Sequence, residues 1–163
     1  EAFFAGEELD APPFPIIEAG YLAGGEQPHA GTLTPQGRIE KDGRTALFDD
    51  IIGNPLNLVT VGDPASVLSA EQFDRLAEVG VAVVSLTPGT PWSVSDVAGT
   101  YRDFFAAIDA EAYIARPDFV VFGTGSMAEV PDLVEDMLAQ LRTDATATEG
   151  TATQERSATE AVA

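Results

Sequence analysis

The chain of 163 residues contains no cysteine and only one histidine, His29. Without thiols it cannot form disulfides, bind metals through thiolates, use a cysteine nucleophile or carry out thiol redox chemistry. A metal site needs several ligands, and no second histidine exists. A catalytic histidine would need an oriented partner, which the sequence does not identify, so we interpret His29 as a loop residue.

Basic residues are scarce as well. Eight lysines and arginines face 27 acidic residues, for a formal net charge of -19. Nucleic acid and anionic membrane surfaces would both be repelled, so we expect neither as a partner. The simplest interpretation of the acidity is solubility.

Long apolar runs are also missing. No segment is long and apolar enough to cross a bilayer, and no basic-then-apolar signal opens the chain. The hydrophobic share of 45% suits a globular protein with one real core. The chain opens with Glu1 rather than Met, which suggests a fragment or a processed product. We expect a cytoplasmic protein.

The most informative stretch runs from Ala112 to Gly123. Two short apolar segments, Ala112–Ala115 and Phe119–Phe122, are joined by Arg116-Pro117-Asp118. Proline presets φ and aspartate can bond its own backbone, so this tripeptide favours a tight turn. The nearly continuous apolar character predicts strands buried on both faces. We therefore place a hairpin in the middle of a sheet or next to it.

Two further apolar strands are predicted at Leu56–Val61 and Val81–Leu86. The helix between them begins at Ser69, forms a capping box with Gln72 and ends at Gly80. Its predicted inner stripe consists of Phe73, Leu76 and Ala77.

Two more helices follow. Ser95 or Asp96 is predicted to cap the first, and the second is predicted to start near Pro131. Apolar residues at helical spacing line the first at Val97, Tyr101, Phe104, Phe105 and Ile108. The second carries Val130, Leu133, Val134, Met137, Leu138 and Leu141 on one face. An aromatic stripe of this kind indicates core packing rather than a cofactor site.

Before these elements lie a turn at Lys41-Asp42-Gly43-Arg44, a short strand at Thr45–Phe48 and a helical turn from Asp49 to Gly53. The adjacent carboxylates of Asp49 and Asp50 could serve a metal or acid–base chemistry. Their place at the start of a helix makes capping the stronger explanation.

Two loop features are weaker candidates. Trp92 lies in a proline- and glycine-rich loop, where it could mark a contact surface or cover the core. Gly123-Thr124-Gly125 is too short and misplaced for a dinucleotide-binding loop, so we predict a turn there. No catalytic, cofactor-binding or metal-binding residue is assigned.

The chain divides into three parts. Residues 1–27 combine several prolines with apolar residues that have no nearby partner, so we interpret them as an exit segment from a preceding domain or an arm over this one. Residues 28–142 form the folded domain. Residues 143–163 are threonine, alanine and glutamate with almost no large apolar side chain, and we expect a disordered tail. Alternating strands and helices predict an α/β fold whose mixed central sheet has helices on both faces.

This order of elements resembles a three-layer thioredoxin-like domain. The redox members of that fold carry C-x-x-C after the first central strand, where this chain reads Pro64-Ala65-Ser66-Val67. They usually have a proline just before the hairpin, where this chain reads Asp109-Ala110-Glu111. The resemblance therefore implies the scaffold without the CxxC motif and without its redox activity.

A closer resemblance is to the C-terminal region of FAD-dependent aromatic hydroxylases of the 3-(3-hydroxyphenyl)propionate hydroxylase type, and it covers Pro28 to Leu141. The residues that carry it are Gly31-Thr32-Leu33 with Pro35-Gln36, Phe48-Asp49-Asp50-Ile51-Ile52-Gly53, and Ile114-Ala115-Arg116-Pro117-Asp118-Phe119-Val120. It implies a parent monooxygenase of aromatic-compound catabolism that binds FAD in a separate N-terminal domain and hydroxylates a phenolic substrate with NAD(P)H and O2.

In that reading the chain is an accessory, structural or oligomerisation domain that packs against the preceding FAD and substrate domain or between subunits. The chain alone is then no enzyme and holds neither FAD nor NAD(P)H. An alternative is a free-standing, redox-inactive thioredoxin-like binding module that uses the Trp92 loop or the hairpin as its contact surface. A carboxylate enzyme based on Asp49 and Asp50 is the weakest interpretation, because nothing basic or nucleophilic stands beside them in the sequence.

Overall fold

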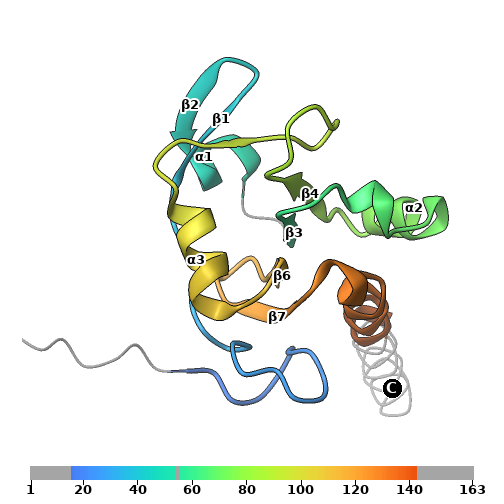
Figure 1. The fold of residues 1–163 in the computed structure, drawn as a ribbon. Coiled ribbons are helices and arrows are strands. Elements are labelled where there is room, and N and C mark those ends of the chain that lie inside the picture. The colour runs from blue at the N-terminus through green and yellow to red at the C-terminus, as the bar shows by residue number, and fades with distance from the viewer. Residues whose placement is uncertain (1–15, 54–55, 143–163) are drawn as a thin grey trace, which may run out of the picture.

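The computed structural model describes residues 16–53 and 56–142, which form two sheets and the helices around them (Figure 1). The predictions for residues 1–15 and for the tail from Thr143 onward lie outside the described residues.

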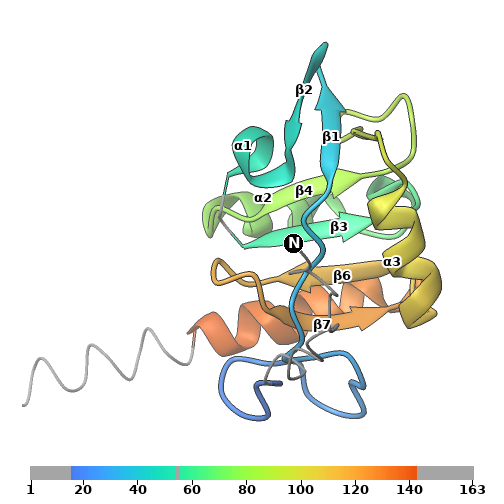
Figure 2. The ribbon, with the colours of Figure 1, turned by 90° about the vertical axis from the view of Figure 1, so that its left-hand side faces the viewer.

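The main sheet has the strand order β4-β3-β6-β7 (Figure 2). It consists of β3 (Asn57–Thr60), β4 (Ala82–Ser85), β6 (Ala112–Ala115) and β7 (Val121–Gly125). β3 and β4 are parallel, as the crossover through α2 (Ala70–Glu78) requires, and β6 runs antiparallel to both β3 and β7. The mixed central sheet is therefore confirmed.

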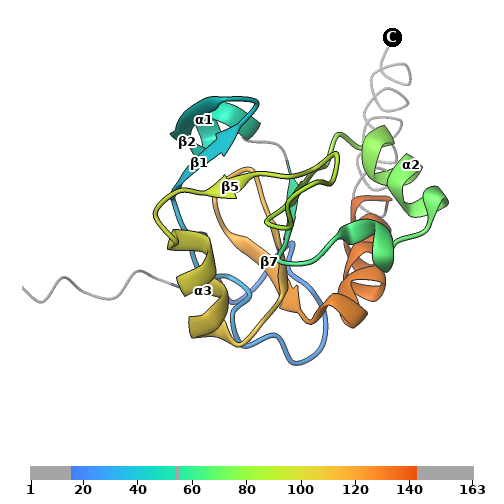
Figure 3. The same ribbon diagram turned by 45° about the horizontal axis from the view of Figure 1, so that its top comes forward.

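Helices cover both faces of this sheet (Figure 3). Successive side chains of a strand point to opposite faces, so Leu58 and Ile114 pack against α2 and the helix of residues 130–142. Their neighbours Val59 and Tyr113 pack against α3 (Thr100–Ile108) on the other face. Every residue of β3 and β6 is buried, which explains the apolar sequence of β6 and of the two central residues of β3, Leu58 and Val59.

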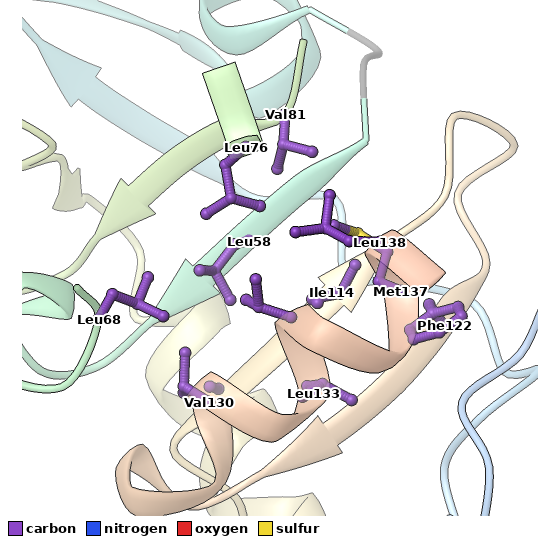
Figure 4. Close-up of a cluster of buried hydrophobic side chains, with 12 residues drawn as sticks. Leu58, Leu68, Leu76, Val81, Ile114, Phe122, Val130, Leu133, Met137 and Leu138 are labelled. Carbon is purple, nitrogen blue, oxygen red and sulfur yellow. The ribbon is translucent and has the colours of Figure 1, made fainter. Parts of the chain in front are cut away.

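The core on the α2 side is made of aliphatic side chains around one aromatic ring (Figure 4). Its buried members are Leu58, Leu68, Leu76, Val81, Ala112, Ile114, Phe122, Val130, Leu133, Val134, Met137 and Leu138. The opposite face holds the aromatic cluster of Phe48, Tyr101, Phe105 and Tyr113 together with aliphatic residues.

A second, three-stranded sheet was not anticipated. It has the order β2-β1-β5 and consists of β1 (Arg38–Lys41), β2 (Arg44–Leu47) and β5 (Ser95–Asp96). The predicted turn between β1 and β2 is confirmed, with φ of 52° at Asp42 and 76° at Gly43. β2 ends one residue before the predicted strand end because Phe48 already opens α1 (Phe48–Ile52).

α2 agrees closely with the sequence. Ser69 and Gln72 form the predicted capping box, and Gly80 follows the helix with φ of 74°. Leu76 is buried, but Ala77 is exposed, so the inner stripe is narrower than predicted.

α3 begins later than predicted because Gly99 (φ 76°) breaks the chain and Ser95–Asp96 pairs with β1 as a strand. The N-cap residue is Gly99 and not Ser95 or Asp96, but the Asp96 Oδ2 accepts hydrogen bonds from the first-turn N–H groups of Tyr101 (2.9 Å) and Arg102 (3.0 Å). Val97 lies before the helix and is 53% exposed, so its assignment to the buried stripe was wrong, whereas Phe105 is only 4% exposed.

The hairpin is confirmed, but its second strand is shifted. Phe119 lies in the turn with φ of 63°, its N–H bonds to the Arg116 carbonyl (3.1 Å), and the Arg116 N–H bonds to the Val120 carbonyl (2.8 Å). A three-residue loop whose last residue is left-handed is a common hairpin connection. The strand therefore starts at Val121 instead of Phe119, and Gly123-Thr124-Gly125 continues it instead of forming the predicted turn.

The last helix starts at Val130, within one residue of the predicted start near Pro131, and a short 3-10 turn precedes it. Ser126 and Glu129 form a capping box around a 3-10 turn, η2 (Met127–Glu129), and an α-helix continues over residues 130–142. Pro131 is the second residue of this α-helix and lies in its first turn.

Candidate functional site

The three sequence blocks that carry the family resemblance meet in space. The first block runs along the outer edge of β7: the Gly31 N–H donates to the Val121 carbonyl, the Val121 N–H donates to the Thr32 carbonyl, and the Thr34 N–H donates to the Phe119 carbonyl, each at 2.8 Å. The blocks therefore converge on the hairpin of β6 and β7. We call the region formed by residues 31–36, 48–53 and 114–120 the hairpin joint.

The second block closes the joint from the side of the small sheet. The Gln36 Nε2 donates to Asp49 Oδ2 (2.8 Å), and the Phe48 N–H donates to the Gly37 carbonyl (3.0 Å). The Phe48 ring lies 5.4 Å from the ring of Tyr101. The Asp49 carboxylate thus fixes the entry to α1, which is a structural use of that residue.

Arg116 ties the hairpin tip together. Its guanidinium forms a bidentate ion pair with Asp118, at 3.1 Å from Nε to Oδ1 and 2.7 Å from Nη2 to Oδ2. Its Nη1 also donates to the Tyr21 carbonyl (3.2 Å). The planar fork of arginine suits such simultaneous bonds. Arg116 therefore stabilises the turn and attaches the upstream chain to it.

The joint leaves almost no internal space. The blocks enclose a cavity of about 10 Å³ that also touches Asn57 and Tyr113. This is room for about one water molecule and far less than a substrate or cofactor occupies. The hairpin joint is therefore a tightly packed part of the protein, formed by the residues that carry the family resemblance.

The upstream residues form a strap, residues 17–27, over β7 and the helix of residues 130–142. The Tyr21 ring lies 4.9 Å from the Phe122 ring, and its hydroxyl donates to the Met137 carbonyl (3.0 Å). The Ala23 N–H donates to the Phe122 carbonyl (2.8 Å).

Further along the strap, the side-chain oxygen of Gln27 accepts from the Thr124 N–H (2.9 Å). The sequence showed apolar residues without a local partner in this stretch, but it gave no signal for the roles of Tyr21 and Gln27.

The other sequence candidates are placed as follows. Asp50 is exposed in the first turn of α1, where the helix dipole favours a carboxylate, but neither Asp49 nor Asp50 is the N-cap residue. His29 lies in a turn, and its carbonyl accepts from the Thr32 hydroxyl (2.7 Å). Within residues 16–53 and 56–142, no cluster of three or more acidic or histidine side chains could hold a metal ion.

Trp92 does not stand alone. Its ring stacks on Phe73 of α2 at 4.7 Å with an interplanar angle of 4°, and both side chains are half-buried. The Trp92 loop thus covers part of α2 and also presents an aromatic edge to solvent.

The glycine pair of β7 does not fit a flavin or nicotinamide pyrophosphate. Gly123 and Gly125 lie in a paired strand rather than in a loop before a helix N-terminus. A Cβ on Gly123 would meet Ala23 Cβ at 2.6 Å and Leu133 Cδ1 at 2.8 Å. The missing side chain makes room for the strap and the last helix.

Two tyrosines are buried beneath the joint. Burial raises the pKa of Tyr101 to about 12, and its hydroxyl accepts a hydrogen bond from the Gly37 N–H (3.3 Å). Burial also raises the pKa of Tyr113 well above its ordinary value. Both hydroxyls stay protonated near neutral pH, so neither is suited to act as a general base.

The loop between β3 and α2 is closed by packing. Asp63 caps the 3-10 helix η1 (Pro64–Ser66) by accepting from the Ala65 N–H (3.0 Å). The Gly62 carbonyl accepts from the hydroxyls of Thr60 and Ser85, both at 2.8 Å, and the Met127 side chain packs over Gly62.

No helix in the described part of the chain is long and apolar enough to cross a membrane.

Comparisons with known proteins agree with the family resemblance that the residues of the hairpin joint carry. The model of the HcaD C-terminal domain family matches residues 31–140. A probable NADH-specific resorcinol 4-hydroxylase of Rhodococcus jostii (strain RHA1) is 35% identical over 144 residues, which are 83% of this chain and 26% of that protein. A 4-methyl-5-nitrocatechol 5-monooxygenase of Burkholderia sp. is 28% identical over 104 residues, covering 63% of this chain and 19% of that protein.

Among solved structures, the flavin-dependent monooxygenase PieE, crystallised with FAD and substrate, is similar with a TM-score of 0.50 and 22% identity. The similarity covers 82% of this chain and 23% of PieE. The chain thus spans about a quarter of the length of the Rhodococcus relative and of PieE.

Proposed function

The chain belongs to the HcaD C-terminal domain family, and from this we propose that it is the C-terminal accessory domain of a flavin-dependent aromatic-ring monooxygenase. The proposal rests on the similarity to the probable resorcinol hydroxylase of Rhodococcus. The two proteins are 35% identical over 83% of this chain, and the match covers only 26% of the hydroxylase. The remaining length of such a parent would hold FAD, the nicotinamide site and the substrate pocket.

We further propose a parent of the 3-(3-hydroxyphenyl)propionate hydroxylase type, a cytoplasmic enzyme of aromatic catabolism that uses FAD, NAD(P)H and O2 on a phenolic substrate. The name of the Rhodococcus relative supports NADH as the reductant. The three sequence blocks of the hairpin joint support this type, because they form one contiguous structural unit.

We propose that the scaffold is thioredoxin-like without its redox chemistry. The β3-α2-β4 unit, the β6-β7 hairpin and the final helix support this assignment. The chain has no cysteine, and a capped 3-10 helix stands after β3. The domain's contribution is then mechanical, through packing on the catalytic body or between subunits of an oligomer.

The proposal is tested by comparing this chain with a polypeptide extended upstream of Glu1. Purified chain is titrated with FAD by absorbance and flavin fluorescence, and NADH consumption is followed with phenolic substrates. We expect no flavin binding and no NADH oxidation by this chain, and both from the extended polypeptide. Low-micromolar FAD binding by this chain, or an extended polypeptide that binds no flavin, would contradict the proposal.

A second candidate function rests on the half-exposed side chains of Trp92, in the loop after β4, and Phe73 of α2, which stack on each other. Such an aromatic pair suits a protein-binding module without a catalytic partner in the same polypeptide, with this loop or the hairpin as its contact surface. The reading frame upstream of Glu1 separates the two functions. A start codon immediately upstream favours the module, whereas an upstream G-x-G-x-x-G strand–turn–helix favours the monooxygenase.

A further inference from the structure

Three of the six large apolar side chains that are exposed among the described residues lie where the strap meets the outer edge of β7. Ile16 is 60% exposed, Ile17 37% and Leu33 45%. The Ile17 N–H donates to the Gly31 carbonyl (3.0 Å), and Leu33 pairs with Val120 beside β7. These backbone contacts bring the three residues to one edge of the domain, and we call them the edge patch.

The remaining exposed apolar residues lie elsewhere. Leu47 and Val97 flank Arg38 on the small sheet, and Val79 follows α2. They provide natural controls, because their exposed fractions of 38%, 53% and 44% match those of the edge patch.

The strap fixes where the upstream chain leaves the domain. The Gln140 Nε2 donates to the Leu22 carbonyl (2.9 Å), and the Gly24 N–H donates to Asp136 Oδ2 (2.7 Å). Together with the Arg116 bond to Tyr21, these contacts hold the strap against the hairpin and the last helix. The upstream chain therefore enters the described part of the domain at Ile16, which is itself a member of the edge patch.

We propose that the edge patch is the surface on which the catalytic body of the same polypeptide docks. This inference rests on the proposed function and names the partner of the domain. The family is a C-terminal domain, so the rest of a parent polypeptide precedes residue 31 and is tethered at the patch. A short tether provides an effective concentration in the millimolar range, so a small apolar surface suffices for docking.

Charge argues against a second copy as the occupant. The chain carries a net charge of -19, and two copies would repel each other. An upstream body of the same polypeptide is already connected to the domain. Its docking therefore avoids most of the translational and rotational entropy that a separate molecule loses on binding.

The test is hydroxyl-radical footprinting, which reports side-chain accessibility. Ile16, Ile17 and Leu33 are compared between this chain and the polypeptide extended upstream of Glu1, with Val79 and Val97 as internal controls. We expect oxidation of the edge patch to fall at least about threefold in the extended polypeptide, with the controls unchanged. Equal oxidation of the patch in both proteins would overturn the inference.

Two further outcomes would also overturn it. Patch protection that rises with the concentration of this chain would indicate a second copy. Protection that is already present in this chain and is lost on deleting residues 1–15 would indicate that this segment covers the patch.

A variant pair gives an independent measurement. In the extended polypeptide, Leu33→Asp is expected to restore oxidation of Ile17 and to separate one thermal transition into two, whereas Val97→Asp leaves both unchanged. An equal effect of the two variants would contradict docking at the patch. FAD binding by the extended polypeptide is measured in the same preparation, so a failure of the proposed function is seen separately from a failure of docking.

Discussion

At the scale of single residues, Gly31 suits its position for two reasons, which are its left-handed backbone and the close approach of Ile17. Its φ is +81°, and a Cβ at this position would overlap the backbone carbonyl of Ile17. Left-handed φ costs a residue with a side chain about 1–2 kcal/mol, and steric overlap adds to that cost. The glycine thus lets the strap approach β7.

We predict that Gly31→Ala destabilises the protein by at least about 1 kcal/mol more than Gly80→Ala. Gly80 has a similar φ of +74°, but nothing lies within 4 Å of its added Cβ. The pair therefore separates steric overlap from backbone strain, and urea unfolding measures both variants. Equal losses would mean that the strap moves away from Gly31 without cost.

Phe105 and Val97 form a second informative pair. Phe105 is buried with its ring 5.5 Å from that of Tyr113, whereas Val97 is exposed before α3. Phe105→Ala is expected to cost about 3–5 kcal/mol in urea unfolding, and Val97→Ala less than about 0.5 kcal/mol. A loss below about 1 kcal/mol for Phe105→Ala would show that this face of α3 is not core.

The same two residues show what sequence can predict. Both fit helical spacing, and periodicity alone could not separate them. The helix start is decided by Gly99 and by pairing of Asp96 with Ile39, and the latter contact lies far away in sequence. Local patterns predicted the buried aromatic residues, but they could not reveal a boundary set by tertiary pairing.

At the scale of elements, the start of the last helix depends on Glu129. Its Oε2 accepts from the Ser126 N–H (2.8 Å) and from the Ser126 hydroxyl (2.7 Å). The bond from the Ser126 backbone N–H, and after it the bond from the Ser126 hydroxyl, lower the pKa of Glu129 below its ordinary value. A carboxylate whose pKa is lowered in the folded state stabilises the fold at pH values above its ordinary pKa. This contribution is lost as the pH falls through the folded-state pKa.

We predict that Ser126→Ala moves the pKa of Glu129 part of the way back up, because the backbone donor remains. It should also lower the free energy of unfolding slightly near neutral pH, because the bond is exposed to solvent, and part of this difference should vanish below the folded pKa. NMR titration of the carboxyl carbons measures the shift. Glu135, whose pKa is lowered chiefly by its bond from Arg75, is the internal control. A Glu129 pKa that does not respond would contradict the capping role.

The elements also mark the limit of sequence analysis. β3, β4 and β6 are apolar on both faces and were predicted nearly residue by residue. β1 and β5 are short and largely polar, so they gave no strand signal. The sequence blocks of the hairpin joint were identified in the sequence. The contacts between its first block and the hairpin join residues 85 to 90 positions apart, so they are visible only in the structure.

At the scale of the whole molecule, the strap belongs to the folded unit. We predict that deleting residues 1–27 lowers the free energy of unfolding by at least about 2 kcal/mol, because Tyr21 and its hydrogen bonds are lost from Phe122 and Met137. Deleting residues 1–15 keeps these contacts and serves as the control. Equal stability of the two truncated proteins in urea would place the domain boundary at residue 28.

The strap also has a consequence for the order of folding. Tyr21 bonds to a residue 116 positions later, and Leu22 accepts a bond from a residue 118 positions later. Contacts of such long range close slowly, and a ribosome delivers the early segment long before its partners. The strap can therefore dock fully only after the final helix has been synthesised, so its docking closes the fold late and links completion of the domain to completion of its C-terminal helix.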